Sequence, residues 1–180
     1  MSIVVRPARP DEAAAVARLA AVTFPLACPP GSTIADQQAF IASTLSPARF
    51  AEYLADPARV VLVAHAGDEH DPVGYTMLVE GDPTDPEVAG ALRVRPTIEL
   101  SKCYVHPDHH GAGAANALME ASVDEGRARG AAAMWLGVNQ LNERAQRFYR
   151  RHGFERVGVK HFQVGDRLED DFVLERVLPA

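Results

Sequence analysis

The segment from Val105 to Asn116 carries the clearest chemical signal in the sequence, because it places two glycines at an expected strand-to-helix junction. Gly111 and Gly113 allow the backbone to adopt positive φ and allow a ligand to approach it closely. The first N–H groups of a helix lack partners within the helix and lie at the positive end of its dipole. We therefore interpret this segment as an anion-binding turn suited to a pyrophosphate, with a ligand-free tight connection as the alternative.

This turn differs from the two common nucleotide-binding fingerprints. No Gly-Lys-Ser/Thr follows it at the spacing of a P-loop. The pattern Gly111-x-Gly113-x-x-Asn116 lacks the third glycine of a dinucleotide fingerprint. Asp124 and Glu125 also come too early to be the acid that binds a ribose. The sequence therefore disfavours a nucleotide-dependent oxidoreductase.

Cys103 and three nearby histidines raise two other chemistries. A cysteine nucleophile needs a positioned base and a group that orients this base, and the sequence marks neither. Adjacent histidines such as His106, His109 and His110 rarely converge on one ion, and no acidic or cysteine partner has a recognised ligand spacing. We therefore interpret Cys103 as a small strand residue and expect no metal site.

The elements that position these residues follow from hydrophobic periodicity and from helix and strand breakers. Helices are predicted from residue 10 onward and over residues 32–45, 47–55, 111–129 and 142–153. Strands are predicted over residues 3–6, 60–66, 73–79, 97–105, 132–138, 154–164 and 171–178, and a loop over 81–96. This order predicts a mixed α/β sheet, mostly antiparallel, with one β-α-β crossover near the middle.

Composition narrows the class of protein. The chain has 180 residues, 47% of them apolar and 23% charged, which is typical of a globular protein with one domain over residues 1–180. The sequence contains no 18-residue apolar run and no signal-peptide pattern, so we expect a cytoplasmic protein without a membrane partner. Two cysteines argue against a disulfide scaffold, and the acidic balance argues against nucleic-acid binding.

The net charge of −6 is unevenly distributed. Residues 68–99 contain eight carboxylates and two arginines, a local charge of −6. Residues 100–167 contain ten basic and seven acidic side chains, a local charge of +3. We interpret the acidic segment as an entrance that attracts a cation, with a solvated loop as the alternative, and the basic segment as the anion-binding half.

The turn and its flanks resemble motif A of the GNAT N-acetyltransferase superfamily. The matching residues are Glu99-Leu100-x-x-x-Tyr104-Val105-x-Pro107, His110-Gly111-Ala112-Gly113-Ala114-Ala115 and Leu118-Met119. Motif B is resembled by Leu136-Gly137-Val138, Asn142-x-x-Ala145-x-x-Phe148-Tyr149 and Gly153-Phe154. The resemblance covers about residues 60–178. His110 stands where Arg or Gln is usual, a position that mostly supplies main-chain contact, and Ala115 replaces a glycine, which the family tolerates.

The resemblance implies a GNAT-like fold, an α/β mixed sheet that is largely antiparallel, with a splayed strand pair and helices on both faces. It also implies that acetyl-coenzyme A, as co-substrate, lies between the splayed strands. The acetyl and pantetheine part is expected to bind the backbone of Cys103, Tyr104 and Val105, and Asn142 is expected to contact the pantetheine or the wall of the cofactor site. The pyrophosphate is expected to bind the N–H groups of the turn, which are those of His110, Gly111, Ala112, Gly113, Ala114 and Ala115. The spacing does not show which of four helix arginines meet the cofactor phosphates, namely Arg144, Arg147, Arg150 and Arg151.

Acetyl transfer to an amine requires two proton transfers. A lysine-like amine with a pKa of about 10.4 is almost wholly protonated near pH 7, so a base must remove its proton, and the leaving thiolate needs an acid. Tyr149, two helical turns after Asn142, matches the family tyrosine and is the candidate acid. Glu99 is the candidate base, directly or through a water molecule. Strand alternation puts Glu99 with Cys103 and opposite Lys102, unless a bulge changes the parity.

The acceptor is predicted less sharply. Three C-terminal stretches resemble bacterial spermidine/spermine N-acetyltransferases, namely Gly153-Phe154-x-x-Val157-Gly158, Phe162-x-x-Gly165-Asp166 and Asp170-Asp171. Together with an acidic mouth built from residues 80–99 and Asp170 or Asp171, they predict a small-molecule primary amine such as a polyamine. An amino acid, an amino sugar or a protein amine stay open as acceptors, as does a non-catalytic sensor that binds acyl-coenzyme A. The sequence does not decide between a monomer and a homodimer.

Overall fold

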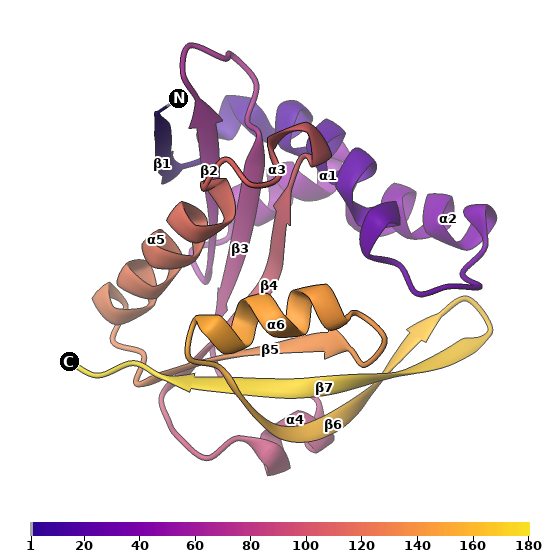
Figure 1. Ribbon diagram of the computed structural model, residues 1–180, viewed down its shortest axis with the longest axis vertical. Coiled ribbons are helices and arrows are strands. Elements are labelled where there is room, and N and C mark those ends of the chain that lie inside the picture. Colours follow the sequence, from indigo (N-terminus) through magenta and orange to yellow (C-terminus); the bar gives the residue numbers. More distant parts are fainter. Residues whose placement is uncertain (1) are drawn as a thin grey trace.

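Seven strands form one sheet in the order β1-β2-β3-β4-β5-β7-β6 in the computed structural model, which describes residues 2–180 apart from the side chains of Phe162 and Val164. The strands are β1 (Ile3–Pro7), β2 (Arg59–Ala66), β3 (Gly74–Glu80), β4 (Thr97–Val105), β5 (Ala133–Asn139), β6 (Glu155–Val164) and β7 (Arg167–Val177). Neighbouring strands are antiparallel except β4 and β5, which are parallel. The predicted mixed, largely antiparallel sheet is therefore confirmed (Figure 1).

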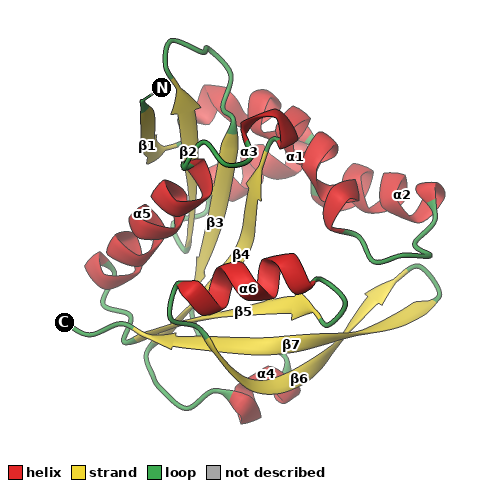
Figure 2. Ribbon diagram, in the orientation of Figure 1, coloured by secondary structure: helices red, strands yellow, loops and turns green. Residues whose placement is uncertain are grey.

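Helices cover both faces of this sheet (Figure 2). One face carries α5 (Ala114–Ala128), which is the crossover between β4 and β5, and α6 (Glu143–Arg151). The other carries η1 (Pro10–Glu12), α1 (Ala13–Ala27), α2 (Ile34–Thr44), α3 (Pro47–Ala55) and α4 (Pro86–Ala91). Within residues 2–180, no helix combines the length and the apolar character that a bilayer crossing demands.

The helices that border the site begin at residues with suitable capping chemistry. The Asn142 side chain accepts a hydrogen bond from the Ala145 N–H (3.1 Å), as an N-cap residue does. Gly113 precedes α5 with a φ of +88°, a conformation that strongly favours glycine. The short 3₁₀ helix η2 (Pro107–His109) lies between β4 and this glycine. These local signals explain why both helix starts were predictable to within a few residues.

Two predictions of local structure are wrong. The sequence predicts a loop over 81–96, but α4 forms there because Asp85 accepts from the Glu87 N–H (2.8 Å) and Pro86 suits a first helical turn. The last strand is predicted to begin at residue 171, but β7 begins at Arg167, because it pairs with β6 from Arg167 onward. Pairing between two strands overrides the weak local signal of Glu169 and Asp170.

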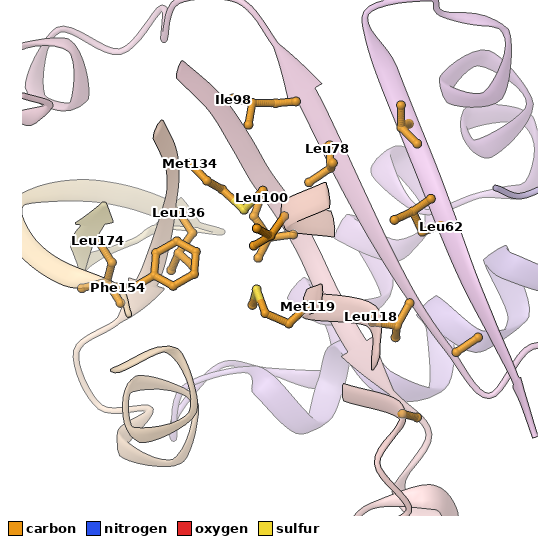
Figure 3. Close-up of a cluster of buried hydrophobic side chains, with 14 of the residues drawn as sticks. Leu62, Leu78, Ile98, Leu100, Leu118, Met119, Met134, Leu136, Phe154 and Leu174 are labelled. Carbon is orange, nitrogen blue, oxygen red and sulfur yellow. The ribbon is translucent and has the colours of Figure 1, made fainter. Parts of the chain in front are cut away.

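Buried side chains fix the helices on both faces. One cluster extends from Leu62 on β2 across to Leu174 on β7, with Leu118 and Met119 of α5 at its centre (Figure 3). A second cluster, with the fully buried Phe50 as a member, joins β2–β4 to α1 and α3. The first cluster therefore spans the two halves of the sheet at the place where β4 and β5 meet.

Candidate active site

The strands β4 and β5 separate soon after they meet. Among the described residues they pair at three positions, ending at Glu99 opposite Trp135. Both strands continue beyond this point, β4 as far as Val105 and β5 as far as Asn139. A cleft of about 730 Å³ occupies the gap and is lined from both faces of the sheet. The splayed strand pair that the sequence resemblance implied is therefore present.

A β-bulge decides which side chains of β4 face each side of the gap. Leu100 lies opposite Leu78 and Lys102 lies opposite Met77, so Ser101 is the extra residue. Below the bulge, Leu100 packs on the α5 face, and above it Cys103 packs on that same face. The bulge therefore changes the parity of the strand, which is the alternative that the sequence left open, and Glu99 and Cys103 lie on opposite sides. Glu99 and Lys102 share the opposite face, where their charges interact.

The glycine turn lies open at one end of the cleft. Gly111 and Gly113 have φ values of +84° and +88°, and a Cβ atom added at either would meet no heavy atom within 4 Å. The His110 side chain donates from Nε2 to the Val105 carbonyl (3.0 Å), which ties the turn to β4. Because this hydrogen bond engages the ring Nε2, we expect His110 to meet a ligand chiefly through its backbone. This is the geometry of an accessible anion cradle.

Most of the predicted site residues line this cleft. They are Glu99, Cys103, Tyr104, Val105, His110, Gly111, Gly113, Ala115, Asn142 and Tyr149. The side chain of Ala114 is instead buried in the core, and Ala112 is exposed outside the cleft, so for these two a ligand contact would have to come from the backbone. The Asn142 oxygen is already engaged in capping α6. Its predicted contact with a cofactor remains a prediction.

Tyr149 is held over the gap by aromatic neighbours on the α6 side. Its ring packs edge-on against Phe154 (5.8 Å between centroids) and Phe148 (5.4 Å). Burial raises the pKa of Tyr149 well above its ordinary value, and a hydrogen bond to the Cys103 sulfur also favours the protonated phenol. Burial raises the pKa of the Cys103 thiol to about 12, so this thiol stays protonated and is not an activated nucleophile. Tyr149 therefore presents an O–H donor that already faces a sulfur atom.

Glu99 lies on the other face of the gap among cationic side chains. Burial raises the pKa of Glu99, while Lys160, Lys102 and Arg59 act in the opposite direction. Burial also lowers the pKa of Lys102 to about 8, against the attraction of Glu99. A carboxyl group with a raised pKa in a cleft is suited to accepting a proton near neutral pH.

Most of the residues in the wall that faces Glu99 were not predicted from the sequence. Lys160 of β6 and Glu169 of β7 line the cleft, together with an apolar set from α1, α2 and the residues after them: Thr23, Phe24, Leu26, Ala27, Cys28, Pro29, Phe40 and Leu45. Asp171, which was predicted to lie at the mouth of the cleft, lines the cleft. No pattern in the sequence links these residues, because they come from four separate elements.

The acidic segment 68–99 does not form the mouth of the cleft, so this prediction is wrong. Of its eight carboxylates, Glu99 alone lines the cleft. Glu80 pairs with Arg129 (3.1 Å) and Glu87 with His161 (2.8 Å) at other places on the sheet. The segment passes through the buried strand β3 and then through α4 before it reaches β4, which disperses charges that are close in sequence.

The structure separates the four α6 arginines. Arg144 and Arg151 line the cleft, whereas Arg147 forms an exposed ion pair with Glu143 (3.6 Å). Arginine suits phosphate geometry, so these two are the candidates for contact with phosphate groups. Among the described residues, no group of three or more His, Cys, Asp and Glu side chains is arranged to hold a metal ion.

Comparison with known proteins assigns this arrangement to a family. The model of the acetyltransferase (GNAT) family matches residues 27–154. Uncharacterised N-acetyltransferases of Mycobacterium tuberculosis and Mycobacterium bovis are each 46% identical over 170 residues, which is 93% of this chain and 97% of each relative. The crystal structure of the PaiA N-acetyltransferase from Thermoplasma acidophilum in complex with coenzyme A superposes with a TM-score of 0.76, covering 98% of this chain and 99% of that one, at 16% identity.

The chain therefore belongs to the GNAT acetyltransferase family, and it is an N-acetyltransferase. The similarity to the solved structure supports the fold, which is the GNAT fold. Members of this family typically use acetyl-coenzyme A as co-substrate. The family membership does not identify the acceptor.

Proposed function

We propose that the protein transfers an acetyl group from acetyl-coenzyme A to a primary amine by direct attack, with both substrates bound in one cleft. The observation that carries this proposal is the gap between β4 and β5, which is lined from both faces of the sheet. Tyr149 and the glycine turn border it on one face, and Glu99 borders it on the other. Two substrates can thus approach one reaction point from opposite faces.

The α5 and α6 face suits coenzyme A. The open turn at Gly111 and Gly113 offers helix N–H groups to a pyrophosphate, and Arg144 and Arg151 add positive charge beside it. From Ser101 to Val105, β4 runs beside β3 on one edge but no longer pairs with β5 on the other, and this free edge offers backbone groups to the pantetheine and acetyl parts. A thioester held there supplies an activated carbonyl carbon and a thiolate leaving group.

The residues on the two faces account for the protons. The acceptor ammonium gives one proton to Glu99, directly or through water, and its nitrogen then forms a bond to the carbonyl carbon as the carbon–sulfur bond breaks. Tyr149 delivers its proton to the departing sulfur, which leaves as a thiol. The raised pKa of Tyr149 keeps this proton in place until negative charge develops on sulfur. The acylated nitrogen then loses its second proton to the Tyr149 phenolate, directly or through water, so that the product is a neutral amide and the phenol is restored. The proton held by Glu99 passes to solvent. A protonated Cys103 thiol provides no covalent route.

A polyamine is the acceptor that the sequence resemblance favours. Three carboxylates line the cleft, Glu99, Glu169 and Asp171, together with the lysines Lys102 and Lys160. The second argument for a polyamine was an acidic mouth formed by the segment 68–99. It no longer applies, because the acids of this segment other than Glu99 lie elsewhere. We therefore retain a primary amine as the acceptor class, with spermidine and spermine as members of the test set.

The test is an assay of the purified protein with acetyl-coenzyme A and a panel of amines. The panel contains simple alkylamines, polyamines, amino acids, amino sugars and a peptide with a free N-terminus, and the readouts are thiol release and the mass of the acetylated product. Turnover with at least one amine is the expected result. Binding of acetyl-coenzyme A in calorimetry without turnover on any amine would instead indicate a non-catalytic acyl-coenzyme-A sensor.

A further inference from the structure

We propose that Asp171 binds the ammonium group of the acceptor, and that this acceptor is a primary amine on an apolar carbon chain with no second positive charge. The inference rests on the function proposed above and names the substrate class of the same cleft. It depends on three features of the face opposite the glycine turn: an unsatisfied buried carboxylate, an apolar wall and a balanced set of charges.

Asp171 is a buried carboxylate, and one of its two acceptor oxygens has no hydrogen-bond donor among the described residues. The residue is 8% exposed and lines the cleft, and this oxygen is Oδ1. A buried acceptor atom left without a donor is costly, and such atoms are rare in folded proteins. Oδ1 itself is covered by protein, whereas the residue lines the cleft, so an ammonium group in the cleft can supply the missing donor once the carboxyl group turns toward it.

The surrounding strands hold this carboxylate at the cleft. The Lys160 side chain lies across β5 at Gly137, where an added Cβ atom would be 2.5 Å from Lys160 Cε and 3.4 Å from Asp171 Oδ2. A side chain at position 137 would therefore displace the end of the flexible Lys160 side chain, so the glycine leaves room for Lys160 and Asp171 to lie together over the strand. The phenol of Tyr104 on β4 lies near enough to Asp171 that the negative charge of Asp171 helps to raise the pKa of Tyr104.

The wall opposite these charges is apolar. Every residue that lines the cleft from α1, α2 and the segments next to them is uncharged. Phe24 of α1 and Phe40 of α2 stack with their ring centroids 4.5 Å apart, which makes this wall rigid. An acceptor that extends from Asp171 along this wall gains by burying carbon, and it loses if it must bury a second charge there.

The charges on this face are already balanced. Glu169 pairs with Arg167 (3.1 Å), so it is neutralised by a neighbour on its own strand. Glu99 interacts with Lys102 and Lys160, and Lys160 also interacts with Asp171. The two remaining carboxylates thus face two ammonium groups, and no surplus negative charge awaits a polycation. A single ammonium group can use the one free acceptor atom, Asp171 Oδ1.

Protonation of Asp171 provides an independent signature. Burial raises the pKa of Asp171 to about 6, with Glu169 and Asp170 acting in the same direction and Lys160 against it. Tyr104 faces it from β4, while β5 contributes residues that do not titrate, Gly137 and Asn139. Only the ionised carboxylate holds an ammonium group strongly, so acceptor binding should weaken as pH falls through about 6.

The test is the variant Asp171→Asn, assayed with the best amine of the panel. We expect the KM for the amine to rise about 10- to 100-fold, the range for loss of a charged hydrogen bond, while kcat changes little. The KM for acetyl-coenzyme A should stay unchanged. The rise of the wild-type amine KM below about pH 6 should disappear in the variant, which a merely structural role would not produce.

The adjacent variant Asp170→Asn is the matched control, because Asp170 is half-exposed, pairs with His161 (3.4 Å) and does not line the cleft. It should leave both KM values unchanged. An unchanged amine KM in Asp171→Asn, in a protein that turns over amines normally, would overturn the inference while leaving the proposed function intact. A wild-type protein that acetylates no amine would instead overturn the proposed function itself.

A second measurement needs no variant and covers the case in which Asp171→Asn does not fold. Hexylamine and 1,6-diaminohexane have the same length and differ by one terminal ammonium group. We expect the wild-type protein to show at least a 10-fold higher kcat/KM for hexylamine, because the second charge would have to enter the apolar part of the cleft. An equal or higher value for the diamine would show that the cleft accepts a second charge, and it would overturn the substrate class.

Discussion

The two faces of the cleft are built by different means. On the α5 and α6 face, the ligand-binding groups are mainly backbone atoms of a strand and of a glycine turn, supported by Tyr149 and by Arg144 and Arg151. On the α1 and α2 face they are side chains, and their charges balance one another. The first face is therefore suited to a co-substrate common to the family, and the second can change its specificity by substitution of a few side chains.

This difference has a physical basis. Backbone N–H groups at a helix start are fixed by the fold, so their binding capacity persists as long as Gly111 and Gly113 can adopt positive φ. Side chains such as Lys160 and Asp171 share the space beside Gly137, and a side chain at that position would take part of it from Lys160. The following variants test whether the two faces act separately, in order of decreasing expected effect.

Tyr149→Phe should have the largest effect, because it removes the proposed acid and leaves the aromatic packing in place. We expect kcat to fall about 10²- to 10⁴-fold, the usual contribution of a positioned acid. The dissociation constant for acetyl-coenzyme A, measured by calorimetry, should stay within a few-fold of wild type. An unchanged kcat would remove Tyr149 from this role.

Glu99→Gln should lower kcat about 10²- to 10³-fold by removing the base on the opposite face. A base acts when deprotonated, and burial raises the pKa of Glu99, so wild-type kcat should rise with pH over a range above the ordinary glutamate value of 4.5. The measurement is kcat at saturating amine between pH 5 and 9, and the acid limb should be absent in the variant. If the fall of kcat at low pH persists in Glu99→Gln, that pH dependence belongs to another group.

Gly113→Val tests the cofactor face alone. The residue has a φ of +88° and open space beyond it, which is where a pyrophosphate would approach. We expect the affinity for acetyl-coenzyme A to fall about 10- to 100-fold, as charge-assisted hydrogen bonds are lost. Acceptor recognition, read from the ratio of kcat/KM values for hexylamine and 1,6-diaminohexane, should not change.

Gly130→Val is the matched control for this variant. Gly130 follows the other end of α5 with a φ of +82°, and a Cβ atom there also meets nothing within 4 Å. The backbone strain is thus comparable, while the site lies outside the cleft. Affinity for acetyl-coenzyme A that falls equally in both variants would attribute the effect to strain rather than to blocked phosphate binding.

The same difference between the faces decides how much the sequence alone could predict. The cofactor face depends on segments that are contiguous in sequence, so Gly113 and Asn142 could be identified from local turn and capping chemistry. The parity of β4 could not be predicted with certainty, because the bulge at Ser101 arises from the register between β3 and β4. Local signals do not contain that register.

The acceptor face depends on contacts between distant elements. Lys160, Gly137 and Asp171 lie on three different strands and meet because β7 pairs between β5 and β6. Their association appears only once the sheet order is known. The acidic segment 68–99 illustrates the reverse error, since its charges are close in sequence and dispersed in space.

The smallest predicted effect concerns a second buried carboxylate, outside the cleft. Glu12 is 7% exposed, slightly more buried than Asp171, but its oxygens accept hydrogen bonds from both terminal nitrogens of Arg6 (2.8 and 2.7 Å) and from the Arg9 N–H (2.7 Å). These donors lower the pKa of Glu12 to about 2, whereas the pKa of Asp171 is raised to about 6. The comparison predicts opposite consequences for the two carboxylates.

Glu12→Gln should therefore lower the free energy of unfolding by about 2 kcal/mol at pH 7, a value reduced from the full pKa shift because Arg6 is partly exposed. The folded pKa lies below the unfolded one, so the stabilisation is present above about pH 4.5 and is lost as pH falls toward 2. Denaturant unfolding of both proteins at pH 7 and pH 3 should show this difference narrowing. Both KM values should stay unchanged, because a carboxylate whose acceptor atoms are filled by the protein stabilises the fold, whereas one with an unfilled atom is available to a ligand.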